Sequence, residues 1–115
     1  LYFKDPLNHT LRIPPIPFTL YKYLLLHPDG VVAQNIFSIK EELFEIYYKG
    51  KISRGTEEES INSIENLCYK TSESVSTINA LISKSLPSSI AEQYKIQNIK
   101  GRYIITLDRD LVKGI

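Results

Sequence analysis

A catalytic site in this chain would have to be built from few reactive side chains. Cys68 is the only cysteine, and His9 and His27 are the only histidines. A thiol nucleophile needs a nearby base such as histidine, but Cys68 falls on an apolar helical stripe and is expected to be buried. The sequence has no glycine-rich phosphate loop, no nucleophile elbow and no cluster of cysteines and histidines at metal-ligand spacing. These residue types predict a protein that is not an enzyme.

Two carboxylates near the C-terminus are the remaining candidates for ion binding. Asp108 and Asp110 stand at alternate positions where a predicted strand ends, and carboxylate oxygens are the ligands that Ca²⁺ and Mg²⁺ prefer. A pair without further ligands usually faces solvent. The sequence therefore predicts no metal site and no cofactor.

Basic side chains gather towards the C-terminus, although the net charge is only +1. Residues 95–113 contain five lysines and arginines against two aspartates, whereas residues 57–73 contain five glutamates against one lysine. A run of β-branched and aromatic residues with a Lys-Gly turn predicts a β-hairpin over 94–107. Its basic residues are Lys95, Lys100 and Arg102. They could hold phosphates through salt-sensitive contacts, or simply protect the edge of a sheet by charge.

Hydrophobic periodicity and turn residues predict the elements at the start of the chain. Two short extended segments, 1–4 and 10–13, are joined by a turn. A helix then begins at Pro17, a favoured residue in a first turn, and continues to Leu26. The sequence HPDG at 27–30 ends this helix.

Serine or threonine followed three residues later by glutamate marks a capping box, in which the hydroxyl accepts from a backbone N–H of the first helical turn. The pattern occurs at Ser38–Glu41, after a short strand at 31–32, and predicts a helix that ends near Gly50. It recurs at Thr56–Glu59 and predicts a helix that ends near Lys70. The apolar stripe of this later helix comprises Ile61, Ile64, Leu67 and Cys68.

A further helix is predicted over 75–86, after a stretch rich in serine and threonine in which Ser72 or Ser74 is the N-cap. At about 100° per residue, its apolar side chains fall on one side and small polar ones on the other. The outer side comprises Ser76, Thr77, Ala80, Ser83 and Lys84, with Asn79 at its edge. Pro87 ends the helix, and Ser89–Glu92 is a third capping box. The outer side is either an ordinary solvated face or a surface that fits the major groove of DNA, where an asparagine pairs with adenine.

The eight tyrosines could stack on the bases of a single-stranded nucleic acid. Most of them, however, fall at core spacing. Tyr21, Tyr47 and Tyr103 are predicted to lie in the core with exposed hydroxyls.

The predicted order is extended hairpin, helix, short strand, helix, loop, helix and hairpin. Four segments carry a family's motifs: PFTLYKYLLL at 17–26, HPDGVV at 27–32, INALISKSL at 78–86 and IKGRYI at 99–104. In these segments the chain resembles the OmpR/PhoB-type winged-helix effector domain of bacterial response regulators. The resemblance implies an α+β fold, a winged helix-turn-helix with a three-helix core, an extra inserted helix, N-terminal short strands and a C-terminal β-hairpin wing.

The resemblance covers nearly the whole chain, so residues 1–115 are expected to form a single winged-helix domain. The chain contains no methionine and opens on Leu1 within an apolar segment. These features indicate a fragment of a longer protein.

Domains of this family bind duplex DNA and regulate transcription, with the recognition helix in the major groove and the wing on flanking phosphates. The DNA-binding residues expected here are Ser76, Thr77, Asn79, Ala80, Ser83, Lys84, Lys95, Lys100 and Arg102. In the family, the segment that corresponds to 50–71 contacts RNA polymerase or a second protomer. This helix departs from the family pattern, because Lys84 is its one outer cation where several arginines are usual, and Glu73 lies near its N-terminal end. The wing turn is also one residue shorter than in the family.

A second class of function stays open, in which the same scaffold docks a protein partner or dimerises without touching DNA. The acidic helix over 56–70 would then be the partner surface. No stretch approaches the roughly 18 apolar residues of a membrane span, and we expect no membrane contact within this segment. A single cysteine excludes an intrachain disulfide and fits a reducing compartment, so we expect the cytoplasm.

Overall fold

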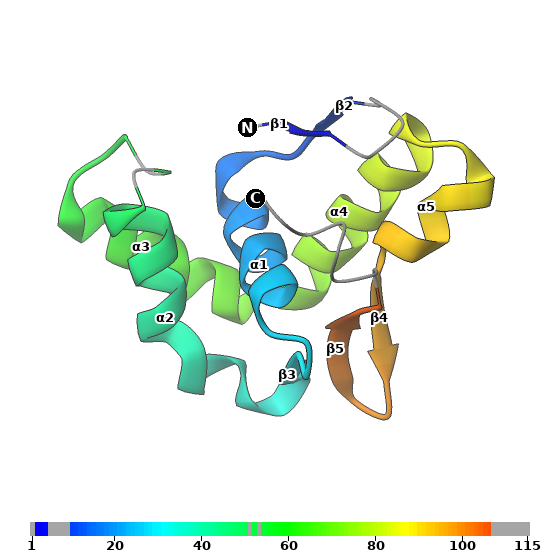
Figure 1. The fold of residues 1–115 in the computed structure, drawn as a ribbon. Coiled ribbons are helices and arrows are strands. Elements are labelled where there is room, and N and C mark those ends of the chain that lie inside the picture. The colour runs from blue at the N-terminus through cyan, green and yellow to red at the C-terminus, as the bar shows by residue number, and fades with distance from the viewer. Residues whose placement is uncertain (1, 5–9, 51, 53, 107–115) are drawn as a thin grey trace.

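The computed structural model of the chain describes residues 2–4, 10–50, 52 and 54–106 and has an α+β fold (Figure 1). Its first half runs β1 (Tyr2–Lys4), β2 (Thr10–Arg12), α1 (Pro15–Leu26), β3 (Val31–Val32), the 3₁₀ segment η1 (Ala33–Ile39), α2 (Lys40–Phe44) and the π-helical turn η2 (Glu45–Lys49). Its second half runs α3 (Glu57–Tyr69), α4 (Thr71–Ser85), α5 (Ser88–Tyr94), β4 (Ile96–Ile99) and β5 (Arg102–Ile105). Within these ranges, no helix combines the length and the apolar character that a transmembrane span requires.

Helix α1 lies between the other helices and contacts α2, α3, α4 and β5. It begins at Pro15, two residues before the predicted start; proline is tolerated there because a first-turn N–H has no intrahelical acceptor. It ends at Leu26, as predicted, and the backbone of His27 after it is extended. Gly30 then turns the chain with a φ of +66°, and a Cβ at this position would lie 1.9 Å from the carbonyl oxygen of Tyr103. The link from α1 to β3 therefore requires glycine to pass against β5.

Antiparallel strands form two small sheets. β1 pairs with β2, and the other sheet has the order β3–β5–β4. The β4–β5 hairpin turns at Lys100 and Gly101, whose φ values of 52° and 80° are those of a type I′ turn. The turn predicted at these two residues is confirmed. The backbone N–H of Ala33 donates to the carbonyl of Gly101 at 2.8 Å and ties η1 to the tip of the hairpin.

Only Lys70 separates α3 from α4. Helix α3 agrees with the helix predicted over 56–70. Helix α4 begins at Thr71, four residues before the predicted start, so neither Ser72 nor Ser74 is its N-cap. The hydroxyl of Thr71 donates to two carbonyls in the last turn of α3, both at 3.0 Å. The stretch rich in serine and threonine is therefore the first turn of α4 rather than a loop.

One of the three predicted capping boxes has its hydroxyl cap in the structure. The Oγ1 of Thr56 accepts from the backbone N–H of Glu59 at 3.1 Å. Ser38 instead donates to the carbonyl of Asn35 at 2.6 Å, because the chain there is a 3₁₀ segment and α2 begins two residues later. At Ser89–Glu92 the prediction is also wrong, since α5 starts one residue earlier and has no side-chain cap.

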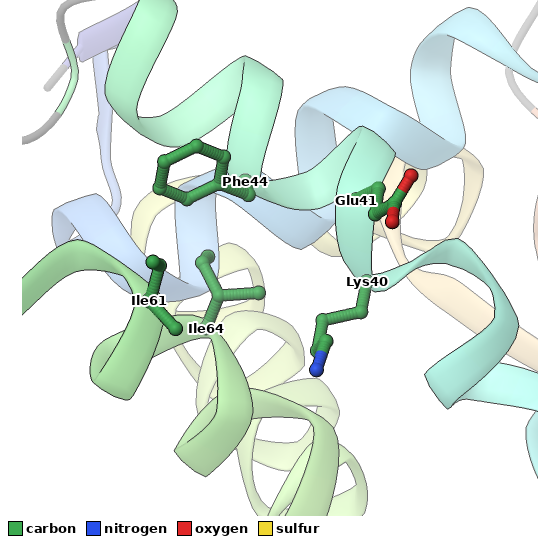
Figure 2. A pocket seen from close by; sticks show the side chains of 5 residues that line it. All are labelled: Lys40, Glu41, Phe44, Ile61 and Ile64. Carbon is green, nitrogen blue, oxygen red and sulfur yellow. The ribbon is translucent and has the colours of Figure 1, made fainter. Parts of the chain in front are cut away.

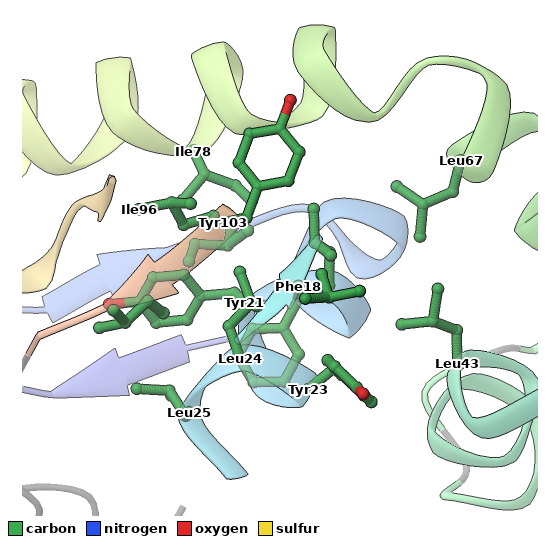
Figure 3. Packing of buried hydrophobic residues seen from close by; sticks show 14 of the residues in the cluster. Phe18, Tyr21, Tyr23, Leu24, Leu25, Leu43, Leu67, Ile78, Ile96 and Tyr103 are labelled. Atoms are coloured by element: carbon green, nitrogen blue, oxygen red, sulfur yellow. The ribbon is translucent and has the colours of Figure 1, made fainter. Parts of the chain in front are cut away.

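Side chains of α1 form the centre of the core, with α2, α4 and the sheet around them (Figure 3). Tyr21 is fully buried and its hydroxyl donates to the carbonyl of Tyr94 at 2.7 Å. The predicted exposure of this hydroxyl is therefore wrong. Tyr47 and Tyr103 lie in the core as predicted. Ile61, predicted on the buried stripe of α3, is 41% exposed.

Candidate nucleic-acid interface

Helix α4 has one buried and one exposed side. Ile78 and Ile82 are fully buried, and Figure 3 shows Ile78 on the side of α4 that faces Ile96 and Tyr103 of the sheet. The residues predicted on the outer side of the helix are all exposed: Ser76, Thr77, Ala80, Ser83 and Lys84. The helical period of the sequence therefore identifies correctly which side of α4 faces solvent.

Helix α4 contacts both β-hairpins. α4 contacts β2 of the N-terminal hairpin and β4 of the C-terminal hairpin. A hollow of about 420 Å³ next to Leu81 is lined by Arg12 and residues 13–15. A second hollow of about 320 Å³ reaches Thr77 and is lined in part by Asn66 of α3. The exposed residues on the outer side of α4 (Ser76, Thr77, Ala80, Ser83 and Lys84), which we call the ridge, thus have a hollow on either flank.

Asn79 is not available to read a base, which corrects its predicted role. Its Nδ2 donates to the carbonyl of Ile96 at 2.9 Å, and its Oδ1 accepts from the N–H of Ile96 at 2.8 Å. Both polar groups of the half-buried amide are therefore used by the first residue of β4. The contact joins residues 17 apart in the chain, so local sequence patterns do not reveal it.

The three basic residues predicted for the hairpin differ in their surroundings. Lys95 lies 2.7 Å from the carboxylate of Glu92, with 24% of its side chain exposed. Arg102 is exposed, and its Nη1 donates to the backbone carbonyl of Asp29 at 3.0 Å, which leaves its other N–H donors for further contacts. Lys100 is exposed in the turn and forms no ion pair with another described residue. Lys100 and Arg102 are therefore better placed than Lys95 to meet an anion.

The outer side of α4 carries little net charge. Lys84 in its last turn is balanced by Glu73 in its first turn, and both are exposed. A phosphate would be attracted to the Lys84 end of the helix and repelled from the Glu73 end. These two charges therefore favour one orientation of a bound nucleic acid more than they raise its affinity.

The reactive side chains do not form a catalytic arrangement in the described part of the chain. Cys68 is buried, its Sγ lies 4.0 Å from the carbonyl oxygen of Ile36, and burial raises the pKa of its thiol. The ring of His27 stacks on Tyr23 with centroids 4.0 Å apart, and its Nδ1 donates to the Tyr23 carbonyl at 2.8 Å. Neither residue makes a recorded contact with the other. His9, Asp108 and Asp110 lie outside the described residues.

The candidate site that remains consists of the exposed ridge of α4 and two exposed cations of the neighbouring hairpin, Lys100 and Arg102. The contact that joins these two elements, Asn79 with Ile96, is the feature that sequence reasoning missed. No family model, curated protein or solved structure matches the chain.

Proposed function

We propose that this domain is a winged helix-turn-helix that binds duplex DNA and regulates transcription. In this proposal α4 enters the major groove and the β4–β5 hairpin holds the flanking backbone. The observation that carries it is the exposed ridge of α4, because its outer residues are small or polar and all of them are exposed. The strand order β3–β5–β4 and a hairpin that follows α4 after the short helix α5 are compatible with a winged helix and support the same proposal.

The chemistry of the ridge suits close approach to DNA. Ser76, Ser83 and Ala80 are short, so the helix backbone can come near the base edges. Hydroxyl groups both donate and accept, which lets them bond to bases or to phosphates. Lys84 adds one cation that can contact a phosphate or a guanine. Because hydroxyls discriminate bases less well than arginine pairs, we propose modest sequence specificity.

The hairpin supplies the electrostatic part of the proposed contact. Lys100 at the turn and Arg102 in β5 are exposed and would neutralise phosphates beside the groove. Lys95 would first have to leave Glu92. We therefore propose that Lys100 and Arg102 contribute more to DNA binding than Lys95.

Binding to a random-sequence duplex at increasing salt tests the proposal, with fluorescence anisotropy of the labelled duplex as the readout. Affinity should fall steeply with salt, and Lys100→Ala should lower the slope of log K against log salt by about 0.9. No binding at low salt, or binding that does not change with salt, would contradict the proposal.

Two variants with the same change in charge locate the contact. Ser83→Glu places a carboxylate on the ridge, whereas Ile61→Glu places one on α3 at a position that is also exposed. We expect Ser83→Glu to weaken DNA binding about tenfold or more. The effect of Ile61→Glu should stay near twofold, roughly that of a distant screened charge. Equal effects would show that only net charge matters.

A second candidate function is a protein-interaction or dimerisation module that does not bind DNA. The balance of Glu73 against Lys84 on the ridge favours it, since a surface without net charge is not attracted to a polyanion. The proposed DNA-binding role extends, by the resemblance, to contact of 50–71 with RNA polymerase or a second protomer, and to a cytoplasmic location. Salt-insensitive self-association without DNA binding would favour the second candidate.

A further inference from the structure

Glutamates are concentrated on α2, η2 and α3, away from the ridge of α4. In the described chain these elements carry Glu41, Glu42, Glu45, Glu57, Glu58, Glu59 and Glu65. Lys40 pairs with Glu65 at 3.5 Å and Lys49 pairs with Glu45 at 3.0 Å. The other five glutamates form no ion pair with another described residue. This part of the surface, which we call the acidic face, attracts cations.

An apolar groove of about 240 Å³ opens on the acidic face between α2 and α3. Figure 2 shows Phe44 of α2 next to Ile61 and Ile64 of α3, with Lys40 and Glu41 at one end of the groove. Ile64 is fully buried, but Ile61 is 41% exposed. The groove therefore presents apolar surface of Ile61 and Phe44 that water reaches, and burying this surface against another apolar side chain is favourable.

A second hollow lies on the acidic face, on the other side of α2. It has a volume of about 320 Å³ and is lined by the end of α1 and by α2 and η2. Leu26 contributes an apolar side chain that is 52% exposed, beside the half-buried Ile46. Glu41 lines both hollows, and Glu42 and Glu45 line the second. The carboxylate of Glu41 thus lies between the two hollows, and those of Glu42 and Glu45 border the second.

We propose that the acidic face docks a basic segment of a partner protein that carries apolar side chains. The apolar side chains of the segment enter the two hollows, and its lysines or arginines meet the glutamates that border them. An amphipathic helix presents both kinds of side chain at suitable spacing, as in other helix-in-groove contacts. Nucleic acid and anionic membranes are disfavoured occupants, because the glutamates repel phosphate.

A second copy of this chain is a poorer fit than a separate segment. The basic β4–β5 hairpin of another copy would bring Lys100 and Arg102 to the glutamates. Among the described residues of that hairpin, however, Ile99 is its one large apolar side chain that is highly exposed. It would fill one hollow and leave the other open.

The acidic face and the proposed DNA surface lie apart. In Figure 1, α2 and α3 lie on one side of α1 and the β4–β5 hairpin on the other. A partner on the acidic face would therefore leave the ridge and the hairpin accessible. The docking proposal does not rest on DNA binding, and either can fail without the other.

A synthetic peptide of leucine and lysine, about four helical turns long with all leucines on one side, is the probe for this face. Fluorescence anisotropy of the labelled peptide with the whole chain measures the affinity. One control peptide replaces each lysine with glutamate, and another replaces each leucine with serine. We expect the leucine and lysine peptide to bind and each control to bind at least about tenfold more weakly.

Matched variants of the protein locate the contact. Ile61→Glu changes the groove and Ile99→Glu changes an equally exposed isoleucine of β4. Glu41→Lys changes the acidic face and Glu73→Lys changes an exposed glutamate of α4. Ile61→Glu and Glu41→Lys should each weaken peptide binding about tenfold, while Ile99→Glu and Glu73→Lys should leave it nearly unchanged. Circular dichroism checks that all four variants fold.

Three results would overturn the docking proposal. The first is no binding of the leucine and lysine peptide at low salt. The second is an equal loss of affinity in the variants of the acidic face and in their matched controls. The third is a dimer of the unliganded chain that Ile61→Glu dissociates, since a second copy would then occupy the groove.

Discussion

The carboxamide of Asn79 holds the backbone of Ile96 by two hydrogen bonds, of 2.9 and 2.8 Å. One bond is donated and the other accepted, so the two groups fix each other's orientation. Asn79 lies in the middle of α4 and Ile96 is the first residue of β4. The contact therefore ties the start of the hairpin to the middle of α4, and with it the position of Lys100 and Arg102 relative to the ridge.

Asn79→Ala should destabilise the fold more than a change on the exposed ridge does. The half-buried N–H and carbonyl of Ile96 would lose their partners, which costs about 1–3 kcal/mol of unfolding free energy. Urea denaturation measures the loss, with Ser76→Ala as the control, for which we expect a change within about 0.5 kcal/mol. Equal losses in the two variants would mean that the contact does not hold the hairpin.

Gly30→Ala should be far more damaging than Gly101→Ala, although both glycines have positive φ. A Cβ at Gly30 would collide with the carbonyl of Tyr103, whereas a Cβ at Gly101 would meet nothing within 4 Å. Gly101→Ala should cost only the strain of its left-handed backbone, about 1–2 kcal/mol. Thermal unfolding of both variants tests the difference. Similar melting temperatures would contradict the close passage of the α1–β3 link against β5.

Burial of Tyr21 should make the stability of the protein fall at high pH. Desolvation, with a smaller effect from Tyr94, raises the pKa of Tyr21 above its ordinary value of 10.0. Above that pH the unfolded chain releases the phenolic proton while the folded chain keeps it, so deprotonation favours unfolding. The contribution of the protonated Tyr21 hydroxyl to the free energy of unfolding is complete below pH 10. It declines by up to about 1.4 kcal/mol for each pH unit above that.

Tyr21→Phe provides the control for this effect. The variant lacks the titrating group and should lose the extra decline above pH 10 relative to the native chain, as measured by urea denaturation at stepped pH. It should also be less stable at neutral pH by about 1–2 kcal/mol, because the buried hydrogen bond from its hydroxyl to the carbonyl of Tyr94 is lost. Parallel curves for the two proteins above pH 10 would show that the hydroxyl is accessible to water.

Cys68 should resist modification in the folded state. It is 4% exposed and burial raises the pKa of its thiol, so little reactive thiolate is present. Labelling with a thiol reagent at neutral pH should proceed much faster in urea than in buffer. Rapid labelling of the native chain would mean that α3 moves away from Ile36 more readily than the packing indicates.

Much of the fold could be predicted from local patterns. The period of apolar residues distinguishes the buried Ile78 and Ile82 from the exposed Ser83 and Lys84. The Lys100–Gly101 pair predicts the hairpin turn, because both residues must adopt positive φ. These features depend on residues close together in the chain.

Features that depend on distant contacts could not be predicted in the same way. The period places Ile61 on the buried stripe of α3, but no described element covers it, so the groove stays open. The residues next to Asn79 in the sequence are the same whether its amide faces a DNA base or a strand. Only the fold brings Ile96, 17 residues away in the chain, to this amide. Residues 71–74 contain no apolar side chain, so the apolar period places the start of α4 too late, and only the fold shows the Thr71 hydroxyl holding this turn against the end of α3.

The most direct test of the proposed DNA surface is an amide chemical-shift titration of the ¹⁵N-labelled chain with a random-sequence duplex at low salt. The account predicts the largest shifts along the ridge, at Ser76, Ala80 and Ser83, and at the hairpin turn, at Lys100. The amides of Glu41 and Ile61 on the acidic face should not move. Shifts centred on the acidic face, or no shifts at any duplex concentration, would contradict the proposal that this domain binds DNA through α4 and its hairpin.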